Sequence, residues 1–337
     1  MNNIENLRTS SRRTTPWTND PSATPTQVFI DSVVQNLFEE RHKAISETAE
    51  VDLVNAIEPQ DCHHCGSSNF MRYGKDRNGI RCYKCKDCGR KFNVLTGTIF
   101  QNHKISITEW IDYCLELFSH MSFNSISKSN RNSLTTTRYW LEKIFMVLDG
   151  YQDDIVLKGN VYLDESYRKV CKSEIQLRPD GKEYRGLSRN QMCIGLACDD
   201  EHVIAIYEGL GHPSLKKTKA TFLSHIAEGS HLIHDQEKSH KVLIEDLKLT
   251  DETYNSNEIK KLKDEDNPLR PINWECYLLQ NFFDAHSAYS RRMIQGYLDL
   301  YAFIRNEGEN SYEKVEKLLM RCFDTRKTLT YRDKYAN

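Results

Sequence analysis

Four cysteines in two Cys-x-x-Cys pairs could hold a metal: Cys62 with Cys65, and Cys85 with Cys88. Two such pairs at this separation are typical of a closed tetrahedral zinc site, because thiolates suit zinc and each pair can turn both sulfurs toward one point. Cys82 could compete as a ligand, but the matching pair spacing favours Cys85 with Cys88. We expect one structural zinc, without which a segment this poor in apolar residues would not fold.

The same segment is strongly basic, with eight Lys and Arg residues against two Asp between residues 72 and 91, a net charge of +6. This charge on a zinc-organised hairpin predicts a surface that contacts DNA phosphates. The alternative is a solvated face that only keeps this cysteine-rich segment soluble. The basic residues are Arg72, Lys75, Arg77, Arg81, Lys84, Lys86, Arg90 and Lys91.

Two aspartates follow short apolar segments with the pattern of strands, Asp164 after Val161–Leu163 and Asp235 after His231–His234. We expect each to end its strand. Carboxylates on neighbouring strands can bridge two magnesium ions about 3.5–4 Å apart, the arrangement for in-line phosphoryl transfer. Glu165 follows directly and is an accessory candidate. A single Asp at a strand end is more often a turn former, as we expect for Asp199 and Asp200.

A third metal ligand should come from the helix predicted at residues 272–284, where Asn273 and Glu275 are the candidates. At 100° per residue, Glu275 falls in the middle of the apolar stripe, where an unpaired carboxylate is costly. Asn273 falls on the polar face with Gln280, so its side-chain oxygen is better aimed at a metal. Glu275 remains the alternative if the helix begins after it.

Hydrophobic periodicity predicts the elements that position these residues. We expect a flexible tail and one helix in residues 1–58, a zinc ribbon in 59–100 and three helices in 101–150. An α/β domain should follow in 159–335, with a polar surface loop at 249–270. Its expected strands are 161–164, 191–198, 203–207 and 231–234, and its expected helices are 215–228, 237–248, 272–284 and 288–304.

The three helices between residues 107 and 148 have the layout of a helix-turn-helix. In that motif the start of the last helix enters the major groove, which would place Thr136, Thr137 and Arg138 against DNA. A purely structural three-helix bundle has the same pattern, and the sequence does not separate the two.

Composition excludes some classes of protein. No apolar run approaches the ~18 residues that span a bilayer, and no hydrophobic segment follows Met1, so we expect neither a membrane protein nor a secreted one. The eleven cysteines are not spaced like a secreted disulfide framework. Reduced thiols and a cytoplasmic location are the expectation.

With these residues in place, the chain resembles the zinc-ribbon insertion-sequence transposases of the DDE superfamily, over roughly residues 58–335. At the position of the family's third catalytic residue the chain resembles the subgroup that has Asn in place of Glu, with the pattern Asp-Asp-Asn. The matching segments, in order, are Cys62–Cys65, Arg81–Phe92, Thr96–Phe100, Leu163–Tyr167, Leu187–Gln191, Gly209–Ser214, Gly229–Asp235 with His240, Ile272–Asn273, Leu278–Leu279 and Tyr297–Leu298.

The resemblance implies a ribonuclease-H-like catalytic domain behind a zinc ribbon and a helix-turn-helix. It further implies binding of double-stranded DNA at the element's terminal inverted repeats and at the target. Strand cleavage and strand transfer would depend on magnesium or manganese held by Asp164, Asp235 and Asn273. The protein would act as a homodimer or higher oligomer on DNA, in a bacterial cytoplasm and at the nucleoid when bound.

One position departs from that subgroup, which usually has Lys where this chain has Gln280. Gln keeps a hydrogen bond but loses the charge that would contact phosphate. The rival interpretation is therefore a domesticated transposase, kept as a non-catalytic zinc-ribbon and helix-turn-helix DNA-binding regulator.

Overall fold

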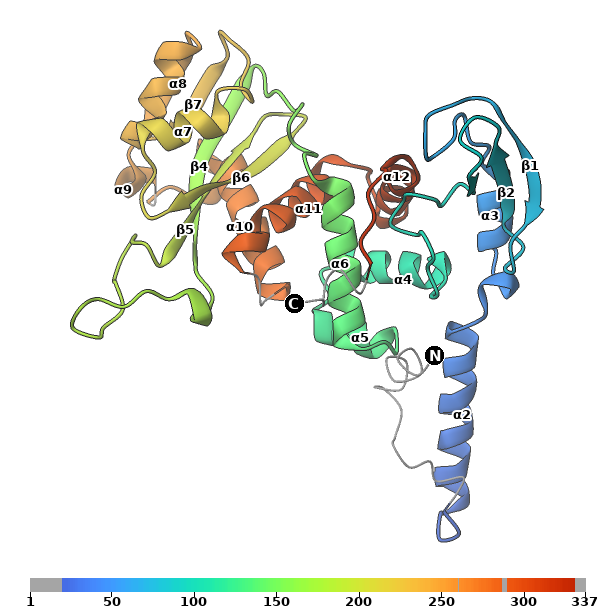
Figure 1. The fold of residues 1–337 in the computed structure, drawn as a ribbon. Helices are drawn as coiled ribbons and strands as arrows, with labels where there is room; N and C mark the ends of the chain where they lie inside the picture. The colour runs from blue at the N-terminus through green and yellow to red at the C-terminus, as the bar shows by residue number, and fades with distance from the viewer. Residues whose placement is uncertain (1–19, 260, 287–289, 331–337) are drawn as a thin grey trace. The chain divides into compact units, whose positions relative to one another are not determined.

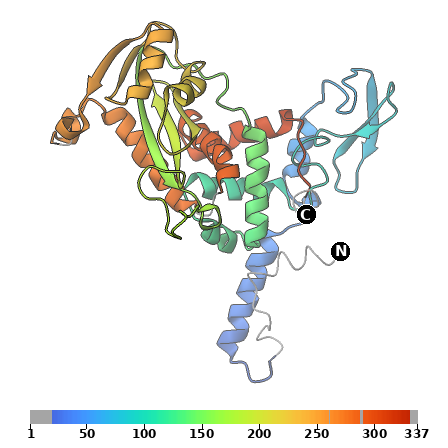
Figure 2. The same ribbon diagram turned by 60° about the vertical axis from the view of Figure 1, so that its left-hand side comes forward.

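The computed structural model describes residues 20–259, 261–286 and 290–330, drawn in Figures 1 and 2. The chain divides into two units. The first consists of residues 1–147 together with 308–337, and the second consists of residues 148–307. Most of the predicted tail, residues 1–19, lies outside the described residues. Among the described helices, none is long and apolar enough to cross a membrane.

A three-stranded antiparallel sheet forms the centre of the ribbon, from β1 (Phe70–Lys75), β2 (Arg81–Cys85) and β3 (Lys91–Phe92). The rings of Phe70, Tyr83 and Phe92 pack together with centroids 5.4–5.6 Å apart. These aromatic residues form the ribbon's own small core together with Cys62, Cys85 and Cys88. A core this small needs a metal or a covalent cross-link to hold the fold.

The helices of the first unit follow the predicted pattern in part. The three helices expected between residues 107 and 148 are present with short breaks. The single helix expected in residues 27–58 is instead two α-helices with a short 3₁₀ turn between them, and a C-terminal helix was not predicted. The elements are α2 (Pro25–Arg41), η3 (Ile45–Glu47), α3 (Glu50–Ala56), α4 (Ile107–Phe118), α5 (Phe123–Ser129), α6 (Leu134–Leu148) and α12 (Ser311–Asp324).

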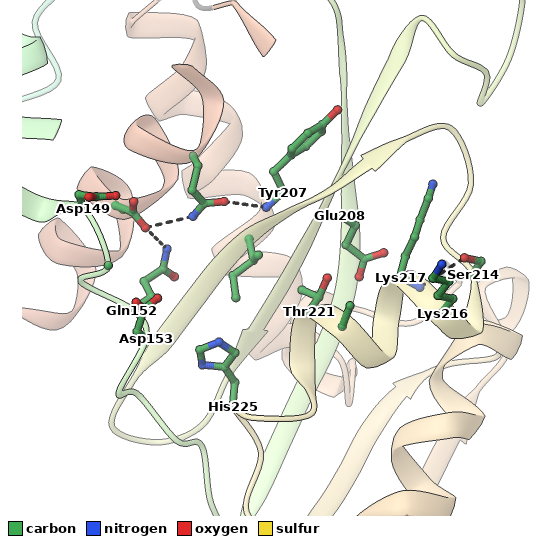
Figure 3. A pocket seen from close by; sticks show the side chains of 15 residues that line it. Asp149, Gln152, Asp153, Tyr207, Glu208, Ser214, Lys216, Lys217, Thr221 and His225 are labelled. Atoms are coloured by element: carbon green, nitrogen blue, oxygen red, sulfur yellow. Dashed lines mark hydrogen bonds between the residues drawn. The ribbon is translucent and has the colours of Figure 1, made fainter. Parts of the chain in front are cut away.

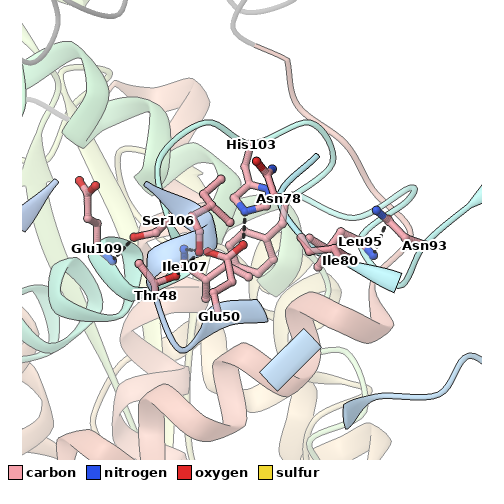
Figure 4. A network of polar contacts seen from close by, with 12 residues as sticks. Thr48, Glu50, Asn78, Ile80, Asn93, Leu95, His103, Ser106, Ile107 and Glu109 are labelled. Atoms are coloured by element: carbon pink, nitrogen blue, oxygen red, sulfur yellow. Dashed lines mark hydrogen bonds and ion pairs between the residues drawn. The ribbon is translucent and has the colours of Figure 1, made fainter. Parts of the chain in front are cut away.

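A buried carboxylate joins α3 to the start of α4 (Figure 4). Glu50 is 2% exposed, and its Oε2 accepts a hydrogen bond from the backbone N–H of Ile107 at 2.6 Å. Its other oxygen contacts the ring of His103. A carboxylate at a helix N-terminus satisfies a free N–H and complements the helix dipole. Glu50 therefore stabilises both the start of α4 and its contact with α3.

The second unit is built on a five-stranded mixed sheet with the order β6-β5-β4-β7-β8. Strands β4, β5 and β6 are antiparallel neighbours, whereas β7 and β8 run parallel to β4. The strands are β4 (Asn160–Lys169), β5 (Gln191–Cys198), β6 (Val203–Leu210), β7 (His231–Asp235) and β8 (Thr250–Tyr254).

Helices cover both faces of this sheet (Figures 1 and 2). On one face, Leu163 of β4 packs in an apolar cluster with Phe222 of α7 (Leu215–Phe222) and Leu243 of α8 (Lys241–Asp246). On the other face, α10 (Arg270–Ala285) packs against β4 and β5, and α11 (Ile294–Asn306) packs against β6. Side chains alternate along a strand, so Asp164 faces the α10 side.

The structure also differs from the sequence expectations in residues 159–335. Strand β4 continues to Lys169, because β5 pairs with it along that whole length, so Asp164 lies within a strand and not at its end. Residues 250–254, expected in a loop, pair with β7 as strand β8. Residues 308–330, expected in the α/β domain, group with the first unit, where α12 packs against α4.

Candidate active site and metal centre

The four predicted zinc ligands meet at one point. The sulfur atoms of Cys62, Cys65, Cys85 and Cys88 all lie within 4.8 Å of one another. The Cys62–Cys88 and Cys65–Cys85 sulfur pairs are each 3.7 Å apart. Tetrahedral zinc with bonds of about 2.3 Å requires sulfurs about 3.8 Å apart. The cluster therefore has the donor set and the spacing of a structural zinc site.

Local turns explain why each pair converges. Gly66 and Gly89 follow the two pairs with φ angles of 73° and 69°, in the left-handed region that favours glycine. Cys82 lies outside the cluster, where its buried thiol points to the carbonyl oxygen of Ile80 at 3.7 Å. Cys82 is therefore not one of the four converging ligands.

The basic residues of the ribbon fall into three groups. Arg72 and Arg81 both form ion pairs with Glu58, at 2.8 and 2.5 Å, so part of their charge is already compensated. Lys84 and Lys91 lie over the ring of Tyr73. The third group consists of the remaining basic residues of the ribbon, which are exposed: Lys75, Arg77, Lys86 and Arg90.

The predicted groove-facing residues of α6 are not all available to a ligand. Arg138 is exposed, but Thr136 and Thr137 are only 3% and 2% exposed. Their hydroxyls contact the hydroxyl and the carbonyl oxygen of Ser133, so burying them leaves no polar group unpaired. In this structure Thr136 and Thr137 are too buried to contact DNA, contrary to the expectation from the sequence.

Asp164 and Asp235 lie side by side on neighbouring parallel strands. The register pairs Leu163 with His234, and the two aspartates are the next residues along β4 and β7. Neighbouring strands are about 4.8 Å apart, which is within the reach of a shared metal pair. Strand β7 ends at Asp235, as predicted. The two residues therefore lie next to each other where β7 ends and β4 continues without it.

The electrostatics of this point favour a cation. Burial, with the charges of Glu165 and Asp235, raises the pKa of Asp164 to about 7. Burial, with Asp235 and Glu237, raises the pKa of Glu165 to about 8. Crowded carboxylates whose ionised forms are unfavourable are typical of functional sites, and a divalent ion would offset their repulsion.

Glu165 faces the opposite side of the sheet and contacts a pair of histidines that were not among the predicted site residues. Its Oε1 is 2.9 Å from Nε2 of His240, whose Nδ1 is 2.8 Å from Nδ1 of His234. Burial lowers the pKa of both histidines to about 4, so both rings are neutral at pH 7. The short spacing of His234, Asp235 and His240 in the sequence was the signal that could have identified them.

Helix α10 packs against β4, the strand that carries Asp164, and its Cys276 is half-buried. Asn273 is half-buried and lies three residues earlier, on the same side of the helix. Gln280 is exposed, and its backbone oxygen accepts a hydrogen bond from Arg168 at 2.6 Å. Asn273 as the third metal ligand therefore stays a prediction.

Glu275, the rival ligand, is held in another contact. It is 6% exposed, and its carboxylate accepts hydrogen bonds from Arg305 at 2.7 and 2.9 Å and from the Tyr301 hydroxyl at 2.8 Å. The helical projection correctly placed Glu275 on the buried face, and α11 supplies the partners that make its burial tolerable. Its oxygens are therefore engaged in packing α10 against α11.

We expect Glu275→Gln to lower the free energy of unfolding by about 1–3 kcal/mol, because it removes a charge from a buried, hydrogen-bonded pair. Urea denaturation measures the change. Glu245→Gln is the matched control, since Glu245 pairs with Lys241 on the surface and such pairs contribute less than about 1 kcal/mol. Equal stability of the two variants would contradict the structural role of Glu275.

A cavity of about 760 Å³ lies elsewhere in the second unit (Figure 3). Its lining includes Asp149, Asp153, Glu208, Lys217 and His225, and it contains none of the three predicted catalytic residues. Lys217 donates to the backbone oxygens of Leu210 and His212 at 2.7 and 2.9 Å, so its ammonium group is already used in the fold.

Comparison with known proteins shows similarity to a transposable-element protein over part of the chain. No family model matches the chain. Over 113 residues the chain is 31% identical to an uncharacterized protein in transposable element ISH50 of Halobacterium salinarum. That match spans about a third of each protein, 32% of this chain and 36% of the other.

Two solved structures illustrate the similarity found by shape. A chain of a pre-cleavage Mos1 transpososome is 11% identical, with a TM-score of 0.25, over 65% of this chain and 78% of the other. A chain of a simian T-cell lymphotropic virus intasome in complex with PP2A regulatory subunit B56 gamma is also 11% identical, with a TM-score of 0.27, over 57% and 65%. TM-scores this low establish neither a shared fold nor a shared site.

Proposed function

We propose that this chain is an insertion-sequence transposase that binds the ends of its element and catalyses metal-dependent DNA strand cleavage and strand transfer. The observation that carries the proposal is the pair formed by Asp164 and Asp235 on adjacent strands. The Cys₄ cluster and the local identity to a transposable-element protein support it independently. The five-stranded mixed sheet is compatible with a ribonuclease-H-like catalytic domain.

The donor set fits magnesium or manganese, because carboxylate and amide oxygens are the ligands that these ions prefer. Asp164 and Asp235 would hold the ions, and Asn273 would complete one coordination shell with its side-chain oxygen. The ions would stabilise the charge that develops on the attacking and leaving oxygens. Water is the first nucleophile, and the freed 3′-hydroxyl is the second. No covalent protein–DNA intermediate is needed.

The ribbon and α4–α6 are proposed to bind the double-stranded ends, with a second copy of the chain completing the assembly on DNA. Arg138 and the exposed ribbon cations supply contacts to phosphate. A bacterial cytoplasmic location, at the nucleoid when DNA is bound, follows from this role and belongs to the proposal.

We expect DNA affinity of the full chain to fall steeply as salt rises, since phosphate contacts release counterions. A Lys86→Gln/Arg90→Gln variant should lower the slope of log K against log salt by about 2, roughly one for each lost contact. Lys241→Gln/Lys248→Gln is the charge-matched control on the second unit, where both lysines already form exposed ion pairs. Fluorescence anisotropy over a salt series measures both slopes, and equal slopes would remove the ribbon from the DNA-binding surface.

A strand-transfer assay on pre-cleaved element ends separates the transposase from a domesticated, non-catalytic regulator. We expect the wild-type chain to join these ends to target DNA with magnesium or manganese and not with EDTA. Gln280→Lys is informative because it restores the charge usual in the resembled subgroup, and we expect it to raise joining. Specific binding without joining in either protein would favour the regulator.

A further inference from the structure

A second group of metal-binding side chains lies beside the carboxylate pair. Ligand atoms of His234, Asp235 and His240 all lie within 4.8 Å of one another. The histidines are 3% and 0% exposed, whereas Asp235 is half-buried at the end of β7. The three residues therefore form a cluster that is buried at the histidines and more exposed at Asp235.

We propose that His234, Asp235 and His240 bind one transition-metal ion, with zinc as the preferred biological ion. Two imidazoles and one carboxylate suit zinc and other nitrogen-preferring cations, whereas magnesium prefers oxygen ligands only. The site thus differs in chemistry from the oxygen site proposed around Asp164. It uses Asp235 but does not depend on the chain being a transposase.

The Nδ1 atoms of the two histidines are close enough to share either a proton or a metal ion. Nδ1 of His234 and Nδ1 of His240 are 2.8 Å apart. Two nitrogens at this distance share either one proton or, after a small outward movement, one cation. Zinc bonds of about 2.0–2.1 Å place two imidazole nitrogens roughly 3.3 Å apart in a tetrahedral site, so a shift of about half an ångström is needed.

Glu165 supplies the outer contact that such sites use. Its Oε1 is 2.9 Å from Nε2 of His240, on the far side of the ring from the proposed ion. A metal-binding histidine usually donates its other N–H to a carboxylate, which fixes the ring and strengthens the ligand. Glu165 therefore acts as a positioning residue for His240, and the ion in turn would fix the carboxylate of Asp235.

The test is the zinc content of the purified full chain after dialysis against zinc and then against excess magnesium. We expect two zinc ions per chain, one in the Cys₄ cluster and one at His234, Asp235 and His240. His240→Gln and His234→Gln should each retain only one. His225→Gln is the control, because this buried histidine bonds the carbonyl oxygen of Ile155 and lies outside the cluster.

The second measurement is a calorimetric zinc titration of the full chain after its Cys₄ cluster has been filled with zinc. Glu165→Gln should weaken the additional binding about 10- to 100-fold, as expected for loss of an outer carboxylate. A wild-type chain that takes up only the ribbon zinc would overturn the proposal and leave the histidines sharing a proton. Undiminished uptake by both histidine variants would also overturn it.

This outcome is separable from that of the proposed function. Asp164→Asn changes the carboxylate pair but none of the three proposed ligands, so the chain should still bind two zinc ions. If the wild-type chain binds two zinc ions but neither cleaves nor joins DNA, only the proposed transposase function is refuted. An active chain with one zinc would refute the second metal site alone.

Discussion

Asp164→Asn and Asp235→Asn are each expected to lower strand cleavage and strand transfer by at least about a thousandfold, which corresponds to about 4 kcal/mol of transition-state stabilisation. Each change keeps the size of the side chain but removes a charge that would hold the metal ions. The ions act mainly on the transition state, so binding to DNA ends should remain within a few-fold of wild type. Cleavage and joining assays, with anisotropy for binding, measure the two effects.

The matched control is Asp200→Asn, the same chemical change at an exposed position of the turn between β5 and β6. It should retain full activity. Asn273→Ala should reduce activity less than either aspartate variant, because a neutral ligand holds a hard cation less strongly. Near-normal cleavage by Asp164→Asn or Asp235→Asn would refute the catalytic assignment, whereas a larger loss in Glu275→Gln than in Asn273→Ala, at equal stability, would make Glu275 the third ligand.

Cys85→Ser is expected to remove one zinc ion per chain and to unfold the ribbon. The small aromatic core around Tyr83 and Phe92 cannot replace the metal, since structural zinc contributes about 10–16 kcal/mol of binding free energy in small zinc domains. Metal analysis measures the zinc, and amide hydrogen exchange in β1 and β2 measures the order of the ribbon.

Cys82→Ser is the control for this prediction, because Cys82 lies in the same strand but outside the cluster. It should keep the zinc and the protection of the strands from exchange. Loss of zinc from Cys82→Ser with retention in Cys85→Ser would reverse the ligand assignment.

Local sequence patterns were sufficient for much of the fold. The spacing of the cysteine pairs predicted the cluster, because each knuckle is a short turn that its own residues specify. Alternating and helical periodicity predicted β5 at its observed bounds and the three helices α4–α6. The helical projection placed Glu275 on the buried face of α10, where the structure has it. These features depend on residues within one or two turns of chain.

Pairing between distant segments decided the rest. The polarity of Thr136 and Thr137 indicated exposure, and only the packing of α6 showed that they are buried. Glu275 looked costly until Arg305, thirty residues later, was found beside it. The residues of β8 are polar and show no alternation typical of a strand. They form a strand only because they pair with the edge of β7.

The candidate site shows the same division. The sequence alone identified Asp164 and Asp235 as carboxylates suited to metal binding, and it predicted that Asp235 ends a strand. Only the parallel register of β4 and β7 decided that the two lie side by side, and only side-chain alternation sent Glu165 to the histidines on the other face. Residue types and spacing thus determine which groups can act, whereas register between strands 71 residues apart in the sequence determines which groups meet.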